Sequence, residues 1–246
     1  MTALIAEIGL NHLGDEQRAR RTLDRVLQAG ANSVTFQIRE PRFYESTESS
    51  HRRLPEGFYR EASIAVHRAG GQFGIAICDE SLVGGLEAIG VDFWKTLSWD
   101  FRNDRLRTVL RGTGRPVFFS TGLSSMKDVV EGSKGLENAI LIHTQLSQKT
   151  ADVNLKAIPA MARGTGLPVA FGLHCSRHDV LKAALAFEPH SMFFYVKERG
   201  VEGLFDDAHA LPLDGLAETL DNLKELMQAL GTGEKEEMEK PAWVVK

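Results

Sequence analysis

Cysteine and long apolar runs are scarce in this sequence, and neither sign of charge dominates it. Only Cys78 and Cys175 occur among 246 residues, which argues against a structural disulfide. No apolar run approaches the roughly 20 residues that a membrane-spanning helix needs, and the N-terminus shows no secretory signal pattern, so we expect a cytoplasmic protein. Lysine and arginine total 29 against 33 acidic residues, a formal net charge of −4. Nucleic acid and membrane surfaces are therefore not expected partners, whereas small polar or charged ligands stay open.

The sequence does contain a regular alternation of strand and helix patterns. Short apolar runs rich in β-branched and aromatic residues predict strands at residues 4–9, 33–38, 72–78, 92–97, 116–121, 139–144, 168–173 and 191–196. Mostly amphipathic segments predict helices near residues 17–28, 57–68, 81–88, 103–110, 126–132, 153–162, 179–186 and 213–230. This order favours a (β/α)8 TIM barrel, a single α/β domain over residues 1–230, rather than a doubly wound sheet. Residues 231–246 are expected to form a charged tail or linker.

Polar residues gather where the predicted strands end, which is the face on which (β/α)8 barrels build their active sites. Two long connections, residues 40–56 and 197–212, lie on the same face and are expected to be lids or disordered segments. Singly, each polar residue is weak evidence, but together they converge on one rim. The candidate site residues are Glu7, Asn11, His12, Gln37, Lys95, Ser98, Ser120, His143, Gln145, His174 and Lys197.

Lys95 interrupts an otherwise apolar strand. Burying an ammonium without a partner is costly, so its side chain is expected to meet a carboxylate or an anionic ligand. One interpretation is an ion pair with Glu7 inside the barrel. Another is an anchor for a phosphate or carboxylate, with Ser98 and Ser120 as hydroxyl donors beside it. A third is a desolvated amine that forms a Schiff base with a carbonyl substrate.

Three histidines and a cysteine follow the sixth and seventh predicted strands, which are neighbours in a barrel. His143, His174, Cys175 and His178 could supply metal ligands, although their spacing matches no dedicated metal motif. The alternative is that the histidines form structural hydrogen bonds and that the thiol is inert in the core. Both interpretations stay open at this point.

Five segments together resemble the N-acetylneuraminate (sialic acid) synthase family. They are Ile-Ala-Glu-Ile-Gly-Leu-Asn-His-Leu-Gly-Asp at 5–15, Gly-Ala-Asn-Ser-Val-Thr-Phe-Gln at 30–37, Phe-Trp-Lys-Thr-Leu-Ser at 93–98, Pro-Val-Phe-Phe-Ser-Thr-Gly at 116–122 and, more loosely, Gly-Leu-His-Cys-Ser at 172–176. The resemblance implies a barrel enzyme that condenses phosphoenolpyruvate with an N-acylated sugar to give a 2-keto acid. It also implies a homodimer and a divalent metal, Mn²⁺ or Mg²⁺, that polarises the sugar aldehyde.

The resemblance assigns roles residue by residue. Glu7 matches an acidic residue near the reacting carbons, and Lys95, Ser98 and Ser120 match phosphoenolpyruvate-binding positions. His174 is the candidate for a catalytic or metal-ligating histidine, with His178 as a second metal candidate. The remaining polar residues of the rim are expected to contact substrate.

Several positions depart from the family pattern. Thr35 stands where the family has a lysine, and residues 75–78 and 143–147 replace the usual motifs of strands three and six. At the two family metal positions the chain has Ser176 and, near strand eight, Lys197. Residues 230–235 resemble the linker to the family's small antifreeze-like C-terminal domain, which this sequence is expected to lack.

Three interpretations follow. The first is a divergent synthase that condenses phosphoenolpyruvate with a sugar or related aldehyde in carbohydrate or surface-glycan biosynthesis. The second keeps the barrel but changes the chemistry to a metal-free lyase, aldolase or isomerase that uses Lys95. The third is a ligand-binding paralogue that has lost turnover. The retained group of Glu7, Lys95, Ser98 and Ser120 favours the first, because such residues are costly to keep without a ligand.

Overall fold

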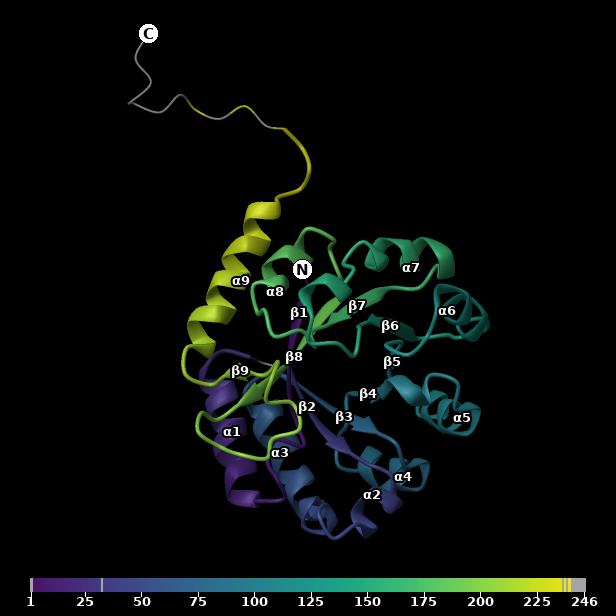
Figure 1. The fold of residues 1–246 in the computed structure, drawn as a ribbon, viewed down its shortest axis with the longest axis vertical. Helices are drawn as coiled ribbons and strands as arrows, with labels where there is room; N and C mark the ends of the chain where they lie inside the picture. Colours follow the sequence, from purple (N-terminus) through teal and green to yellow (C-terminus); the bar gives the residue numbers. More distant parts are fainter. Residues whose placement is uncertain (1, 32, 236, 238, 240–246) are drawn as a thin grey trace.

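The computed structural model describes residues 2–31, 33–235, 237 and 239, and within them eight parallel strands close into a barrel (Figure 1). Each strand pairs with the next in sequence, and β1 also pairs with β8, which closes the sheet. The barrel strands are β1 (Ala3–Gly9), β2 (Ser33–Ile38), β3 (Gln72–Ile77), β4 (Phe93–Thr96), β5 (Val117–Ser120), β6 (Ala139–His143), β7 (Val169–Gly172) and β8 (Ser191–Lys197). The prediction of a (β/α)8 TIM barrel is confirmed.

Helices surround the barrel on its outer side, and Figure 1 shows them following the strands in chain order. They are α1 (Glu16–Gln28), α2 (Pro41–Glu45), α3 (Glu56–Arg68), α4 (Val83–Glu87), α5 (Asp104–Gly112), α6 (Met126–Gly132), α7 (Ala157–Thr165), α8 (Val180–Leu185) and α9 (Leu216–Leu230). Four single-turn 3-10 helices and a two-residue strand complete the described elements: η1 (Ser50–Arg52), η2 (Glu80–Leu82), η3 (Ser98–Asp100), η4 (Thr150–Asp152) and β9 (Leu211–Pro212), which pairs with β8.

The apolar core has two main layers because successive strand side chains point to opposite faces of the sheet. The outer layer packs the strands against the helices, and Trp94 and Phe36 are among its fully buried members. The inner layer fills the lower barrel with Ile5, Phe93, Phe118, Ile140, Ile142, Ala170 and Phe193. The barrel is therefore closed below the C-terminal ends of its strands, and a ligand has room only above this layer.

The elements differ from the sequence-based expectations mainly in the connections. The long segment 40–56, expected to be a lid or disordered, carries α2 and η1, which the sequence patterns did not predict. The final helix is shorter than predicted, because α9 begins at Leu216 rather than at residue 213. The predicted tail has described residues at 231–235, 237 and 239, and its remaining residues lie outside the described part of the chain.

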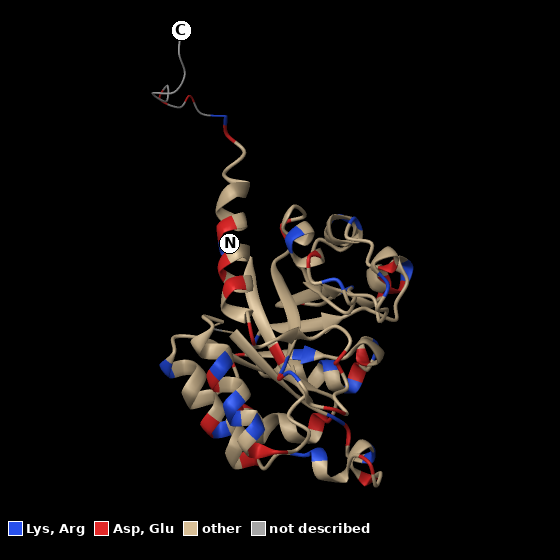
Figure 2. Ribbon diagram, turned by 60° about the vertical axis from the view of Figure 1, so that its left-hand side comes forward, with Lys and Arg blue, Asp and Glu red and all other residues tan. Residues whose placement is uncertain are grey.

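Charge is mixed over the outside of the barrel. Figure 2 shows lysines and arginines beside aspartates and glutamates on the outer helices, and ion pairs such as Arg20–Glu16 and Lys182–Asp179 account for part of this pattern. No helix among the described residues is long and apolar enough to cross a membrane.

Candidate active site

A pocket of about 190 Å³ opens at the C-terminal ends of the barrel strands, directly above the inner apolar layer. We call it the central pocket. Five of the sequence-predicted residues line it: Gln37 on β2, Lys95 on β4, Ser98 in the turn after β4, Ser120 on β5 and His174 after β7. The lining residues are Leu10, Gln37, Arg39, Lys95, Leu97, Ser98, Trp99, Ser120, Leu146, His174, Tyr195, Phe205 and Asp206.

Glu7 and Lys95 form a buried ion pair at the base of the central pocket. Alternation along β1 and β4 points both side chains into the barrel, and Lys95 Nζ contacts Glu7 Oε2 with side-chain exposures of 5% and 3%. Burial raises the pKa of Glu7, and the Lys95 ammonium opposes that rise. Of the two, Lys95 lines the pocket, so the pair presents its cation to a ligand.

Two buried hydroxyls lie together on the β4 and β5 side of the central pocket. Ser98 Oγ is 2.8 Å from Ser120 Oγ and accepts a hydrogen bond from the backbone N–H of Gly122 at 3.2 Å. A Cβ at position 122 would lie 2.7 Å from Ser98 Oγ, so this close approach requires glycine there. The arrangement offers hydroxyl donors to an anion held by Lys95.

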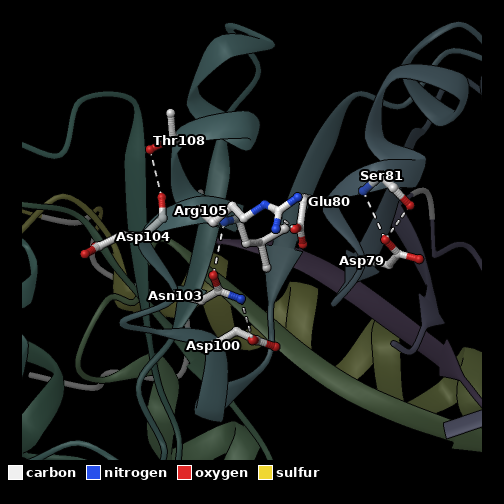
Figure 3. Close-up of polar contacts among 9 residues, drawn as sticks. Asp79, Glu80, Ser81, Asp100, Asn103, Asp104, Arg105 and Thr108 are labelled. Atoms are coloured by element: carbon white, nitrogen blue, oxygen red, sulfur yellow. Dashed lines mark hydrogen bonds and ion pairs between the residues drawn. The ribbon is translucent and has the colours of Figure 1, made fainter. Parts of the chain in front are cut away.

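The turn that carries Ser98 is fixed by a polar cluster between η3 and α5 (Figure 3). Asn103 Oδ1 accepts from the Leu106 N–H and caps α5, while Asn103 Nδ2 donates to Asp100 Oδ1 at 3.1 Å. Arg105 pairs with Glu80 Oε1 at 2.7 Å and so ties α5 to η2. The hydroxyl of Ser98 therefore rests on a braced element and not on a free loop.

His174 and Tyr195 also line the central pocket, and with the adjacent His209 ring they form an aromatic group that we call the His–Tyr cluster. The His174 and His209 ring centroids are 4.6 Å apart, and Tyr195 lies edge-on to His209 at 5.1 Å. Burial lowers the pKa of His174 to about 3, with the charges of His209 and Lys95 acting in the same direction. His174 is therefore a neutral imidazole at pH 7.

Backbone geometry at the end of β1 makes room for this cluster. Gly9 has φ of +57°, and a Cβ there would lie 2.7 Å from Tyr195 Cε1. Glu7 and Tyr195 are register partners across β1 and β8, so the tyrosine stands beside the ion pair. Burial raises the pKa of the Tyr195 hydroxyl well above its usual value, and the carboxylates of Glu7 and Asp206 add to the rise.

The two long connections meet at the edge of the central pocket. The Arg39 guanidinium lies 4.4 Å from the Phe43 ring centroid and 4.9 Å from that of Trp99, and it forms two 2.9 Å hydrogen bonds to Glu40. The Phe43 ring is 5.7 Å from Phe205, which belongs to the connection between β8 and β9. Trp99 and Phe205 are each 51% exposed, so the pocket mouth is aromatic and open to solvent.

Two predicted site residues of the β1 loop support the site without lining the central pocket. Asn11 Nδ2 donates to the Val196 carbonyl at 2.9 Å, and Asn11 Oδ1 accepts from the Asp206 N–H at 3.4 Å. It therefore holds the connection that brings Asp206 to the pocket. His12 is buried, its Nδ1 accepts from the Gly14 N–H at 2.9 Å, and burial lowers its pKa to about 4.

Four other predicted residues also lie outside the pocket lining. His143 Nε2 is 2.8 Å from the Val153 carbonyl oxygen, and burial lowers its pKa. Gln145 is exposed, whereas Lys197 pairs with Asp207 Oδ1 at 2.8 Å. His178 is half-buried, and burial lowers its pKa. A substrate or metal role for these residues stays a prediction.

Sequence reasoning missed Tyr195, Asp206 and His209. Tyr195 lies within the mostly apolar strand β8, so the sequence pattern did not single it out. Its spacing of two residues from Lys197 nevertheless places both on the same face of the strand. Asp206 and His209 belong to the connection 197–212, where His209 Nε2 lies 3.5 Å from Asp206 Oδ1. The expectation that this connection covers the functional face was a signal that its own acidic and histidine side chains could enter the site.

The residues present do not fit the divalent metal that the family resemblance implies. Ser176, at the first implied position, has its hydroxyl donating to the Gln148 carbonyl at 3.3 Å. Lys197, near the second, is a cation that would repel a metal ion. In the described part of the chain, no group of three or more His, Cys, Asp or Glu side chains is placed to hold one ion.

Comparisons with known proteins agree with this architecture. The chain is 30% identical over 252 residues to an uncharacterized protein of Methanocaldococcus jannaschii, covering 95% of this chain and 73% of that one. It is 26% identical to the N-acetylneuraminate-9-phosphate synthase of Homo sapiens, covering 95% and 72%.

The fold has a similar solved structure, the N-acetylneuraminic acid (sialic acid) synthetase of Leptospira borgpetersenii in complex with citrate. The TM-score is 0.87 at 24% identity, and the match covers 96% of this chain and 87% of that one. The sequence model of the NeuB family matches residues 20–235. This match spans most of the barrel, and the chain therefore belongs to the NeuB family.

Proposed function

We propose that this protein is a carbohydrate-biosynthetic enzyme that condenses phosphoenolpyruvate with a sugar or related aldehyde to give a 2-keto acid. The observation that carries the proposal is the grouping of a buried cation, Lys95, with the Ser98 and Ser120 hydroxyls in one pocket at the catalytic end of the barrel. Membership of the NeuB family and the synthase names of its relatives support the same reaction class.

The reaction balances without an external redox partner. The enol carbon C3 of phosphoenolpyruvate attacks the aldehyde carbon and forms a carbon–carbon bond, while the aldehyde oxygen takes up a proton. Water adds to C2, the bond from C2 to the phosphate oxygen breaks, and phosphate leaves. The products are a 4-hydroxy-2-keto acid and inorganic phosphate. The donor, phosphoenolpyruvate, carries a carboxylate and a phosphate, and the pocket must bind both anionic groups.

The charges and hydroxyls of the central pocket suit this anionic donor. Lys95 supplies a positive charge at a buried position, where an ion pair is stronger than in bulk water. Ser98 and Ser120 supply hydrogen bonds to phosphate or carboxylate oxygens, and Arg39 adds a second cation at the mouth. The carboxylate of Glu7 keeps the Lys95 ammonium in place when the pocket is empty.

Position 35 sets an expectation for affinity. Thr35 is fully buried beside Glu7 in the strand register, and its hydroxyl has no hydrogen-bond partner among the described residues. A lysine side chain there would add a cation near the donor, so its replacement by threonine removes one electrostatic contact. We expect phosphoenolpyruvate to bind through Lys95, the two serines and Arg39 alone.

The experiment is a thermal unfolding measurement of the purified full chain with phosphoenolpyruvate, followed by phosphate-release assays across a panel of aldoses. A ligand at a hundredfold excess over Kd stabilises the folded state by about 2.7 kcal/mol, which is visible as a rise in Tm. Lys95→Gln is expected to abolish the rise. No rise in Tm with phosphoenolpyruvate, together with no phosphate release, rejects the proposal.

The same preparation tests the alternative chemistry. An imine enzyme needs a free Lys95 amine, whereas here the ammonium is held by the Glu7 carboxylate. Borohydride treatment in the presence of small carbonyl compounds is expected to leave Lys95 unmodified in a peptide mass map. A stable adduct at Lys95 would replace condensation with a lyase or aldolase reaction.

A further inference from the structure

At the two positions where the family resemblance implies metal ligands, this chain has Ser176 and Lys197, and the His–Tyr cluster lies in the same region. Ser176 and Lys197 provide a hydroxyl engaged with the backbone and an ammonium engaged with Asp207. The His–Tyr cluster occupies the same end of β7 and β8, and it brings His174 and Tyr195 to the pocket lining. An acceptor carbonyl bound at this end of the pocket would meet His174, Tyr195 and the neighbouring Asp206.

The polar atoms of His174 and Tyr195 are free to meet a ligand. Within the described chain, neither the Tyr195 hydroxyl nor the His174 ring forms a hydrogen bond with another residue. Tyr195 is buried and His174 is partly exposed, and both line the central pocket, where their polar atoms can meet a ligand. Among the other histidines, His143 reaches the Val153 carbonyl and His12 Nδ1 accepts from Gly14, whereas His12 Nε2 and His209 Nε2 are buried without a hydrogen-bond partner among the described residues.

Both groups are donors at neutral pH. A tyrosine hydroxyl is protonated at neutral pH, so Tyr195 can donate to an oxygen and can also give up its proton to a strong base such as an alkoxide. The His174 ring carries at least one N–H in either protonation state. The Asp206 carboxylate also lines the pocket, and its Oδ1 lies 3.5 Å from His209 Nε2.

We propose that Tyr195 and His174 bind and polarise the acceptor carbonyl oxygen directly by hydrogen bonds, and that this chain has no resident divalent metal at that position. The inference rests on the proposed condensation and names how its second substrate is activated. As the carbon–carbon bond forms, negative charge develops on the carbonyl oxygen, which takes the Tyr195 proton. Tyr195 recovers a proton from the water that adds to C2, so the balance given above is unchanged.

The first test uses Mn²⁺ alone and needs no substrate. The full chain is stripped with EDTA, equilibrated with Mn²⁺ over a concentration series, and analysed for free Mn²⁺ by electron paramagnetic resonance. The expected result is no stoichiometric binding and no Mn²⁺-dependent rise in Tm. One tightly bound Mn²⁺ per chain overturns the inference. Because phosphoenolpyruvate is absent, failure of the proposed condensation leaves this result intact.

The second test removes one hydroxyl. Tyr195→Phe is compared with Tyr59→Phe, a matched loss of a buried tyrosine hydroxyl on α3, outside the central pocket. Tyr195→Phe is expected to keep the wild-type Tm, because no internal hydrogen bond is lost, and to keep the Tm rise with phosphoenolpyruvate. Its phosphate release with an accepted aldose is expected to fall about 10²- to 10³-fold, with no recovery on adding Mn²⁺.

The outcomes separate the two proposals. No effect of phosphoenolpyruvate on any variant rejects the condensation, and the Mn²⁺ titration still decides the metal question. A Tm of Tyr195→Phe several degrees below wild type shows a structural tyrosine and overturns the donor role. Full activity in Tyr195→Phe, or activity that vanishes in EDTA and returns with Mn²⁺, overturns it as well.

Discussion

At the scale of single residues, the Glu7–Lys95 ion pair sets the energetic cost of burying charge at the base of the central pocket. Both side chains are almost fully buried, so each charge depends on the other for compensation. Replacing such a pair with apolar groups is often neutral, whereas removing one partner leaves an isolated buried charge. The pair therefore indicates selection for a charged pocket more than for stability, which is consistent with a site for an anionic ligand.

Lys95→Met is expected to lower the free energy of unfolding by about 3–5 kcal/mol, because the Glu7 carboxylate is left buried without a partner. Urea denaturation at pH 7 measures the change. The double variant Glu7→Leu with Lys95→Met is the control, and its loss is expected to be smaller than that of Lys95→Met alone. If the double variant is less stable than the single variant, the pair does not act as a compensating unit.

Ser120→Ala is expected to weaken phosphoenolpyruvate binding by about tenfold, because one hydrogen bond to a charged group contributes roughly 1.5 kcal/mol. Isothermal titration measures the affinity. Ser63→Ala is the matched control, since Ser63 is buried on α3 and donates to the Gly90 carbonyl, far from the pocket lining. Equal effects of the two variants would show that Ser120 acts through general stability.

At the scale of elements, short turns with braced ends place the pocket side chains. The 3-10 helix η3 carries Ser98 and Trp99, and it is held by Asp100 against the cap of α5. Ser125 caps α6 in a similar way, with a reciprocal bond from its backbone to Asp128, but α6 contributes no residue to the pocket lining. Substitutions at Asn103, which caps α5, and Ser125, which caps α6, can therefore distinguish an effect on stability from an effect on ligand binding.

Asn103→Ala is expected to lower the free energy of unfolding by about 1 kcal/mol, the usual cost of losing an N-cap, and also to weaken phosphoenolpyruvate binding. The second effect follows because loss of the Asp100 bond frees η3 and with it Ser98. Ser125→Ala is expected to match the stability loss and to leave binding unchanged. Denaturation curves and titration on both variants check this. Equal phosphoenolpyruvate affinity in the two variants would show that the Asn103–Asp100 bond does not hold Ser98 in place.

At the scale of the whole molecule, the barrel was predictable because its signals are local. Short apolar runs at 4–9 and 92–97 predicted β1 and β4, and the side chains of Asp15, Asn103 and Ser125 cap α1, α5 and α6 from within the same short segments. The Glu7–Lys95 ion pair was one of the interpretations left open, and the structure contains it. A closed parallel sheet then brings residues distant in sequence to one rim, which explains the meeting of Lys95, Ser98, Ser120 and His174.

The rest of the site could not be predicted because it depends on how the long connections fold back. Asp206 and Phe205 reach the central pocket through a connection held by Asn11 and by Arg52, whose guanidinium lies 4.4 Å from the Phe205 ring. Such contacts have no periodic signature in the sequence. The same connections turn Lys197 toward Asp207 and leave it outside the pocket lining.

The whole molecule should lose stability below neutral pH because it buries neutral histidines. The pKa of His12 is lowered to about 4 and that of His174 to about 3, in both cases mainly by burial, against 6.5 for the unfolded chain. Between those values the unfolded state binds more protons than the folded state, so stability is full above about pH 6.5 and falls as the pH decreases.

Each of these histidines contributes a slope that approaches about 1.4 kcal/mol per pH unit once the pH is well below 6.5, so the loss from pH 6.5 to pH 5 is about 3 kcal/mol for the pair. Glu7 opposes this, since its raised pKa makes the folded state bind more protons above pH 4.5. Urea denaturation at pH 7, 6 and 5 measures the net slope, which we expect to stay destabilising toward acid. His12→Gln is expected to remove roughly half of it, while His51→Gln, at an exposed position on η1, leaves it unchanged. A flat profile in the wild type would contradict this expectation, because it would mean that the folded state takes up as many protons as the unfolded chain between pH 7 and pH 5.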